Sequence, residues 1–284
     1  MAQGLEGAAY WKLLGKFLRK MEDYMKLSLL LPTLGDRKSE LIRLFDSLVI
    51  QEYPNFEVIV LSQANYRDVD EIIRAYDGIN IIHVKLSRKG LSYARNRGLE
   101  RASGDIIVLS DDDCWYHSQS LKILVDTFQR HENLKVLLTQ IYDPDTKKAY
   151  KKYRPKAEFI ASITGLMSRS SIEIAFRRTS CDSFFDEQFG LGSTYVCGEE
   201  IDFLINNFQK GRFYLYKPVV TVFHPIKRKT TGHQERVYAK GALYAKNFCL
   251  PVSILVILRD LIMKGQNNLT PFSKGYKHYI SRAI

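Results

Sequence analysis

The alternation of short apolar segments with segments of helical spacing is the feature that most constrains how this chain folds. From residue 26 onward, short apolar runs suited to buried strands alternate with runs whose apolar residues recur every three or four positions. We expect strands at 26–31, 56–61, 80–84 and 106–109, separated by helices at 39–49, 68–76 and 92–102. This order predicts an α/β fold with a parallel, doubly wound sheet. With 45% hydrophobic residues, the 284-residue chain can bury such a core.

The second half of the chain is less regular. We expect strands at 134–141, 162–168 and 219–223, helices at 198–209 and 235–248, and a further apolar run at 250–258. The expected organisation is one domain over 25–225, with halves at 25–113 and 114–225, followed by a helical tail over 226–284. Residues 1–24 have the spacing of an amphipathic helix. Three interpretations stay open for it: a helix packed on the body or on a second subunit, an interfacial membrane helix, or an extension preceding a natural start at Met25.

The positive charge is concentrated at the C-terminal end. The chain has a net charge of +11, yet residues 225–284 hold 11 basic and 2 acidic side chains, against 31 and 29 in the rest. This pattern excludes a protein that is basic all over, and it indicates one end that faces a polyanion. Four cysteines without a CxxC spacing indicate reduced thiols. We find no secretory signal, and no apolar run reaches the roughly 18 residues that span a bilayer.

Three consecutive aspartates, Asp111, Asp112 and Asp113, directly follow the expected strand at 106–109. Adjacent carboxylates repel one another, and a divalent cation removes that repulsion. Oxygen ligands suit Mg²⁺ or Mn²⁺, which also bridge to phosphate oxygens. The alternative is a solvated acidic turn or a helix cap.

The ends of the four expected strands should meet around one crevice, because ligands of such sheets bind beyond the carboxyl ends of the strands. The segments brought together are 33–37, 62–65, 86–90 and 111–113. Gly90 and the helix that follows it offer backbone N–H groups, and Lys89 and Arg95 offer positive charge, which together suit a diphosphate. The chain lacks the GxxxxGK[ST] motif of P-loop ATPases and the GxGxxG motif of dinucleotide-binding dehydrogenases.

Two further signals lie in the second half. Glu199 and Glu200 follow Gly198 at the start of an expected helix, where a carboxylate serves either as a helix cap or as a general base. His224 follows the expected strand at 219–223, and its value as a metal ligand depends on its distance from the aspartates.

These segments occur in the order found in family 2 glycosyltransferases of the GT-A fold, and the chain from Leu27 to His224 resembles the members that build bacterial polysaccharides. The resemblance rests on five ordered segments: LSLLLPT at 27–33, SLVIQEYPNFEVIV at 47–60, GLSYARNRG at 90–98, ASGDIIVLSDDD at 102–113, and FDEQFGLG with GEEIDF at 185–192 and 198–203.

The resemblance implies a role for each matching residue. Asp111, Asp113 and His224 would contact a Mn²⁺ or Mg²⁺ ion, and Glu200 would be the catalytic base, with Glu199 as its rival. The donor site would be formed by Pro32, Thr33, Ser62, Lys89, Gly90, Arg95, Asp111 and Asp112, and the acceptor site would include Gly190, Gly192 and Gly198. One departure concerns the donor base: where the family often has Asp-Asp or Asp-Gln after the second strand, this chain has Ser62-Gln63. Donors of the UDP, dTDP and GDP types therefore all stay open.

The resemblance thus implies an inverting, metal-dependent transfer of a sugar from a nucleotide diphosphate to a glycan or lipid-linked saccharide. Because of the basic tail we expect peripheral binding to the anionic inner face of the plasma membrane, from the cytoplasm. Packing of the tail on the body or in a homo-oligomer is the alternative. A non-catalytic module that binds nucleotides or anionic lipids is the rival function, and we expect no nucleic-acid partner.

Overall fold

The computed structural model describes residues 25–180, 183–209, 213–226, 232–264 and 269–283. The helix expected at 1–24 therefore lies outside the described residues, as do the basic residues at 227–229.

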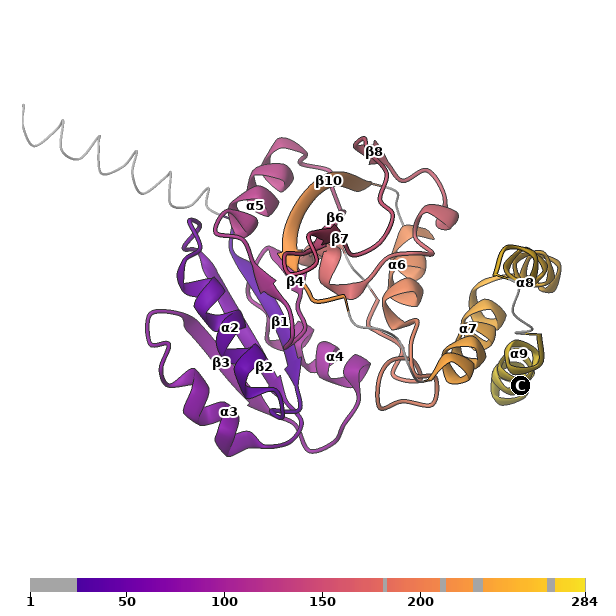
Figure 1. Cartoon of the computed structure of the whole chain (residues 1–284), viewed down its shortest axis with the longest axis horizontal. Helices are drawn as coiled ribbons and strands as arrows, with labels where there is room; N and C mark the ends of the chain where they lie inside the picture. Colours follow the sequence, from indigo (N-terminus) through magenta and orange to yellow (C-terminus); the bar gives the residue numbers. More distant parts are fainter. Residues whose placement is uncertain (1–24, 181–182, 210–212, 227–231, 265–268, 284) are drawn as a thin grey trace, which may run out of the picture.

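One mixed sheet organises the described part of the chain (Figure 1). Its first half is parallel and runs in the order β3-β2-β1-β4; its second half continues with β9-β6-β10-β5. The bounds are β1 Leu27–Thr33, β2 Phe56–Ser62, β3 Asn80–Lys85, β4 Ile106–Leu109, β5 Trp115–Tyr116, β6 Val136–Asp143, β9 Ile174–Arg177 and β10 Tyr214–Phe223. Two short strands, β7 (Lys148–Ala149) and β8 (Glu158–Phe159), pair with β6 and β10.

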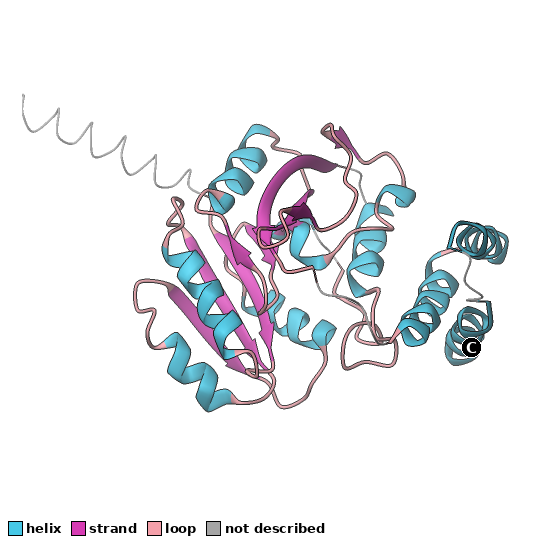
Figure 2. Cartoon of the chain, in the orientation of Figure 1, coloured by secondary structure: helices cyan, strands magenta, loops and turns pink. Residues whose placement is uncertain are grey.

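Helices cover both faces of this sheet (Figure 2). The helices are α2 Lys38–Val49, α3 Tyr66–Ile73, α4 Leu91–Arg101, α5 Ser120–Arg130 and α6 Glu199–Gln209. Apolar residues of α2, α3 and α5 share one core with the sheet, while those of α4 and α6 share the other. The predicted doubly wound α/β architecture is therefore confirmed. The antiparallel strands β9 and β5 are additions that the sequence pattern does not reveal.

The tail forms three helices, α7 (His233–Asn247), α8 (Leu250–Lys264) and α9 (Leu269–Ala283). The first of them is part of the main core, because Ala239, Ala242 and Leu243 are buried in the same cluster as residues of α6. Helices α7 and α9 cross closely at Gly241 and Gly275, and a Cβ atom on Gly275 would lie 1.9 Å from the Tyr238 carbonyl oxygen. Among the described residues, no helix has the length and apolar character required to cross a membrane.

Three local expectations differ from the structure. The segment expected as a strand at 162–168 instead contains a 3₁₀ turn, η1 (Ile163–Gly165). Leu166, directly after the turn, is the one buried residue of this segment. Helix α2 begins at Lys38, one residue before the expected start at 39, with Arg37 at its N-cap position. The first strand continues through Pro32 to Thr33 rather than ending before it. Pro32 is tolerated there because β4 pairs with β1 only as far as Leu30.

Candidate functional site

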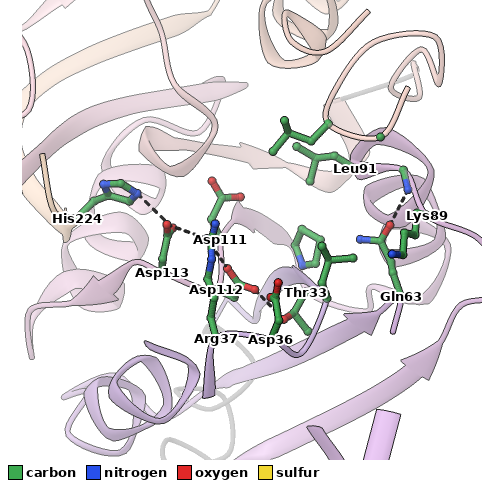
Figure 3. A pocket seen from close by; sticks show the side chains of 15 residues that line it. Thr33, Asp36, Arg37, Gln63, Lys89, Leu91, Asp111, Asp112, Asp113 and His224 are labelled. Carbon is green, nitrogen blue, oxygen red and sulfur yellow. Dashed lines mark hydrogen bonds and ion pairs between the residues drawn. The ribbon is translucent and has the colours of Figure 1, made fainter. Parts of the chain in front are cut away.

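A cleft of about 340 Å³ opens at the carboxyl ends of β1, β2 and β4, where the strand order predicts a ligand site (Figure 3). Four segments expected around the crevice contribute to it, and residues from the second half close it. Its lining comprises Pro32, Thr33, Leu34, Asp36, Arg37, Gln63, Lys89, Gly90, Leu91, Asp111, Asp112, Asp113, Leu191, Gly192 and His224.

Asp112 and Asp113 lie at the floor of the cleft and are almost buried. Thr33 Oγ1 donates to Asp112 Oδ2 at 2.7 Å, and Arg37 Nη1 reaches Asp112 Oδ1 at 3.1 Å and Asp113 Oδ2 at 2.8 Å. Burial raises the pKa of the Asp112 carboxyl, an effect that the Thr33 hydroxyl and the Arg37 guanidinium oppose. The positive charge of Arg37 therefore partly relieves the repulsion expected between these aspartates.

His224 approaches the aspartates, as a metal ligand in this position must. Its Nε2 atom lies 3.1 Å from Asp113 Oδ1, and its Nδ1 atom lies 2.7 Å from the Pro225 carbonyl oxygen. The Tyr150 ring packs edge-on against the imidazole, with ring centroids 5.3 Å apart. The imidazole is thus held from three sides with one nitrogen directed at Asp113.

The charges of the lining fit a divalent cation. Four aspartates face only Arg37 and Lys89 in the described lining, so an anionic diphosphate would enter a cleft of net negative charge. A carboxylate oxygen and an imidazole nitrogen, together with phosphate oxygens and water, form a set of ligands that Mn²⁺ and Mg²⁺ accept. Within the described residues, no cluster of three or more His, Cys, Asp or Glu side chains is arranged to hold a metal without such help. The residues therefore fit a metal that binds together with a diphosphate.

Of the groups expected to bind the donor, some face the cleft and others are engaged by neighbouring residues. Lys89 is exposed at the rim of the cleft. The Gly90 N–H, which we expected to face a phosphate, donates instead to Gln63 Oε1 at 2.6 Å. Ser62 is buried, and its hydroxyl lies 2.7 Å from His83 Nε2, so Gln63 rather than Ser62 lines the cleft.

Arg95 occupies a different place from the one expected. Its fully buried guanidinium lies behind the aspartates, where Nη2 contacts Asp111 Oδ1 at 3.0 Å and Nη1 contacts Glu199 Oε1 at 3.1 Å. Asp111 also accepts from Ser171 Oγ at 3.3 Å and is one-third exposed. Arg95 therefore links the aspartate cluster to the start of α6 instead of facing a diphosphate.

The two glutamates at the start of α6 have different environments. Glu199 is buried and committed to Arg95. Burial and the neighbouring Glu199 charge raise the pKa of Glu200 to about 8, although the Arg95 charge opposes this rise. A carboxyl group with such a pKa is suited to exchange a proton near neutral pH.

The three glycines expected near the acceptor all have positive φ, a conformation that favours glycine. Gly192 lines the cleft, and a Cβ atom on Gly190 would lie 3.1 Å from Ser92 Oγ and 3.4 Å from the Glu199 carboxyl carbon. Gly198 precedes α6 and packs against Leu243 of α7. These glycines shape the wall between the cleft and α6.

Sequence reasoning missed three residues that contact the site. Arg37 and Gln63 lie within the segments expected around the crevice. Arg37 was assigned no role, and Gln63 was considered only with Ser62, as a group able to hydrogen-bond the donor base. Tyr150 belongs to the basic segment 147–156, which folds back beside the site because Lys151 Nζ bonds Glu173 Oε1 at 2.7 Å. Only the position of Arg37, four residues beyond the end of the first strand, offered a signal in advance.

Comparison with known proteins supports this description of the fold. The chain is similar to S. aureus TarS 1–349 in complex with UDP-GlcNAc (18% identity, TM-score 0.63, covering 78% of this chain and 66% of the TarS chain). It is also similar to the mannosyltransferase PcManGT from Pyrobaculum calidifontis in complex with GDP-Man and Mn²⁺ (14% identity, TM-score 0.59, covering 97% and 79%). These likenesses confirm the expected GT-A fold.

Among proteins related in sequence are a glucosyl-dolichyl phosphate glucuronosyltransferase of Haloferax volcanii and the amylovoran biosynthesis glycosyltransferase AmsB of Erwinia amylovora. The first is 26% identical over 110 residues, which cover 38% of this chain and only 35% of the relative. The second is 23% identical over 229 residues, which cover 74% of this chain and 73% of AmsB. The model of the family described as Glycosyl transferase family 2 matches residues 28–187, more than half of the 284-residue chain, and the protein therefore belongs to that family.

Proposed function

We propose that the protein is an inverting, metal-dependent glycosyltransferase that moves a sugar from a nucleotide diphosphate to a hydroxyl group of a glycan or lipid-linked saccharide in cell-surface polysaccharide synthesis. The observation that carries this proposal is the linked arrangement of two carboxylate sites. Arg95 joins Asp111, at the cleft, to Glu199, which is adjacent to the base candidate Glu200. A donor held in the cleft would lie beside a group able to accept a proton.

The donor class is supported by the structural neighbours and by the cleft. TarS and PcManGT were solved with UDP-GlcNAc and GDP-Man respectively, so this fold accommodates both uridine and guanosine donors. The segment after β2 carries no carboxylate at Ser62 or Gln63. We therefore keep UDP-, dTDP- and GDP-sugars as candidate donors.

Glu200 is the proposed catalytic base, because the Glu199 carboxylate is occupied by Arg95. The acceptor oxygen attacks the anomeric carbon as its proton passes to Glu200. The bond between that carbon and the diphosphate oxygen breaks, and the diphosphate leaves with the electron pair. A single displacement of this kind inverts the anomeric carbon.

Asp113 and His224, with Asp111 nearby, are the side chains proposed to hold Mn²⁺ or Mg²⁺. Such an ion neutralises charge on a departing diphosphate, which is the main electrostatic demand of the reaction. The presence of Mn²⁺ beside GDP-Man in PcManGT supports this proposal. The chain's own contribution is to orient His224 through Pro225 and Tyr150.

The test combines nucleotide binding with sugar transfer. UDP, dTDP and GDP should each be titrated with and without Mn²⁺ into the wild type, Asp113→Ala and Glu200→Gln. Transfer should then be followed from the corresponding sugar nucleotides to a lipid-linked saccharide extract. We expect Asp113→Ala to lose the metal-dependent part of binding. Glu200→Gln should keep binding and lose about 10²- to 10⁴-fold in transfer.

Glu100→Gln is the matched control for Glu200, because Glu100 pairs with Arg97 on the exposed surface of α4. Wild-type turnover in both Asp113→Ala and Glu200→Gln would refute the mechanism. Metal-dependent nucleotide binding without transfer to any acceptor would instead favour a non-catalytic binding module.

We also propose that α8 docks on an anionic membrane surface. One side of α8 packs inward through the buried Ser253, while its other side exposes apolar residues: Leu250 (54% exposed), Val252 (38%), Ile254 (46%), Leu255 (66%) and Leu258 (47%). Figure 1 shows this helix on the far side of α7 from the sheet. The sequence over 225–284, which includes α8, carries 11 basic and 2 acidic side chains. An apolar face beside basic charge suits an anionic bilayer.

Vesicle sedimentation of the full chain tests this docking. We expect wild type to sediment with phosphatidylglycerol-containing vesicles more than with phosphatidylcholine vesicles, and Leu250→Glu/Leu255→Glu to lose this binding. The control is Val49→Glu/Ile50→Glu, which changes two equally exposed apolar residues (59% and 60%) at the end of α2. Equal binding by the two variants would overturn the proposal. So would a wild-type dimer that α8 substitution converts to a monomer while vesicle binding is absent.

A further inference from the structure

The Arg37 guanidinium occupies one carboxylate oxygen of Asp113, the residue proposed to hold a metal ion. The carboxylate oxygens of Asp112 and Asp113 each have a partner: Thr33 Oγ1 and Arg37 Nη1 on Asp112, His224 Nε2 and Arg37 Nη1 on Asp113. A metal ion that uses Asp113 Oδ2 therefore competes with the guanidinium for the same oxygen.

The Arg37 side chain has room to move, unlike its partners. It is 45% exposed, whereas the side chains of Asp112 and Asp113 are 11% and 9% exposed. Its backbone is fixed at the N-cap position of α2, where its carbonyl oxygen accepts the Leu41 N–H. The guanidinium can thus leave the aspartates by side-chain rotation while the helix stays in place.

The same cleft offers this guanidinium a second anionic partner. Arg37 and Lys89 both line it, and a diphosphate bound there would meet these two cations. A guanidinium can bind phosphate oxygens with two parallel N–H donors, as it binds carboxylates. A diphosphate therefore draws Arg37 away from the aspartates and opens Asp113 to a metal.

We propose that Arg37 is an exchangeable counter-ion, which neutralises Asp112 and Asp113 in the unliganded protein and transfers to the donor diphosphate when a divalent cation takes its place. This inference rests on the proposed function, since it assumes that a nucleotide diphosphate and a cation share the cleft. Its consequence is coupling. Each of the two ligands removes an obstacle to the other, so Mn²⁺ and nucleotide bind more tightly together than alone.

Direct binding measurements on Arg37→Met test the exchange. Mn²⁺ binding is followed by the paramagnetic resonance of the free ion, with and without a saturating concentration of UDP, dTDP or GDP, whichever binds wild type most tightly. In wild type we expect the nucleotide to tighten Mn²⁺ binding by about 5- to 150-fold, the usual range of coupling between two sites. In Arg37→Met we expect Mn²⁺ alone to bind several-fold more tightly, because a competing positive charge is gone. The nucleotide should bind more weakly there, and the coupling factor should fall toward one.

Lys38→Met is the matched control, because it removes one positive charge from the next residue, whose ammonium pairs with the partly exposed Asp68. We expect it to leave both affinities and their coupling unchanged. Thermal unfolding of each variant confirms that it is folded.

The two levels of the argument fail in different ways. If wild type binds none of UDP, dTDP and GDP, with or without Mn²⁺, the proposed function fails and this inference fails with it. If wild type binds both ligands and Arg37→Met matches Lys38→Met, the exchange is wrong and the proposed function stands. Weaker binding of Mn²⁺ alone in Arg37→Met would also overturn the exchange, because Arg37 would then support the metal site rather than compete for it.

Discussion

Replacing Arg95 by methionine tests whether its buried ion pairs organise the site. The substitution keeps an unbranched side chain of similar length but removes the positive charge between Asp111 and Glu199. The two pairs should contribute unequally. Arg95 and Glu199 are 0% and 7% exposed, and breaking a buried pair by removing one partner costs about 3 to 5 kcal/mol. Asp111 is 33% exposed, so solvent screens its loss and adds at most about 1 kcal/mol.

Urea unfolding of four proteins measures this cost: wild type, Arg95→Met, Glu199→Gln and the double variant. We expect Arg95→Met to lose about 3 to 5 kcal/mol of unfolding free energy, since Glu199 is left as a buried, unpaired charge. Glu199→Gln should lose about 1 kcal/mol, because its amide oxygen still accepts from Arg95. The double variant holds no buried charge at this point. It should therefore be more stable than the sum of the single effects predicts, by about 1 to 3 kcal/mol.

A second readout of the same variant concerns Glu200. The Arg95 charge opposes the rise of the Glu200 pKa above its ordinary value, so its removal should move that pKa further upward. The rising limb of the pH–rate profile for transfer should therefore shift to higher pH in Arg95→Met. A loss below about 1 kcal/mol together with strict additivity in the cycle would refute the structural role assigned to this arginine.

Three further predictions concern other parts of the molecule. Because the pKa of Glu200 is raised to about 8, the folded protein binds a proton that the unfolded chain releases above pH 4.5, so this group's stabilising contribution is lost as pH rises toward 8. Denaturant titrations should show Glu200→Gln gaining stability over wild type at pH 8.5 but not at pH 4; no pH-dependent difference would contradict this. Gly275→Ala should lower the melting temperature, since the new Cβ would lie 1.9 Å from the α7 backbone. Gly78→Ala is the control, because a Cβ there would have no atom within 4 Å. Equal melting temperatures of the two variants would show that the helices do not cross closely. Burial raises the pKa of the Cys114 thiol to about 12, so mass spectrometry after brief alkylation of the native protein should find the exposed Cys249 modified and Cys114 unmodified; early labelling of Cys114 would place it outside the core.

The half over 25–113 was largely predictable from sequence because its central strands β1, β2 and β4 are buried almost throughout. Continuous apolar runs at 56–61, 80–84 and 106–109 match the observed strands to within one residue, and the aspartates follow the last of them as expected. The crevice then follows from the parallel order alone, because every carboxyl end lies on one edge of the sheet.

The second half was less predictable because its elements are short and depend on distant partners. Strand β9 has four residues and pairs antiparallel with β4 and β6. The local sequence pattern does not predict this pairing. The buried position of Arg95 between two carboxylates was not predicted, for a related reason. A basic residue near a helix start suggests an exposed anion site, and only the three-dimensional fold reveals that carboxylates from β4 and α6 converge on it.

The packing of α7 also bears on when the proposed active site would be completed during synthesis. Lys246 bonds the fully buried Asp202 of α6 at 2.8 Å and Asp186 at 2.7 Å, and Leu243 packs beneath Gly198. These residues emerge from the ribosome some forty positions after the glutamates that they support. The nucleotide half can therefore fold early, whereas the wall that carries Glu200 stays without its backing until the tail has been made. A nascent chain would pass through a stage at which it could bind a donor but could not yet transfer the sugar to an acceptor.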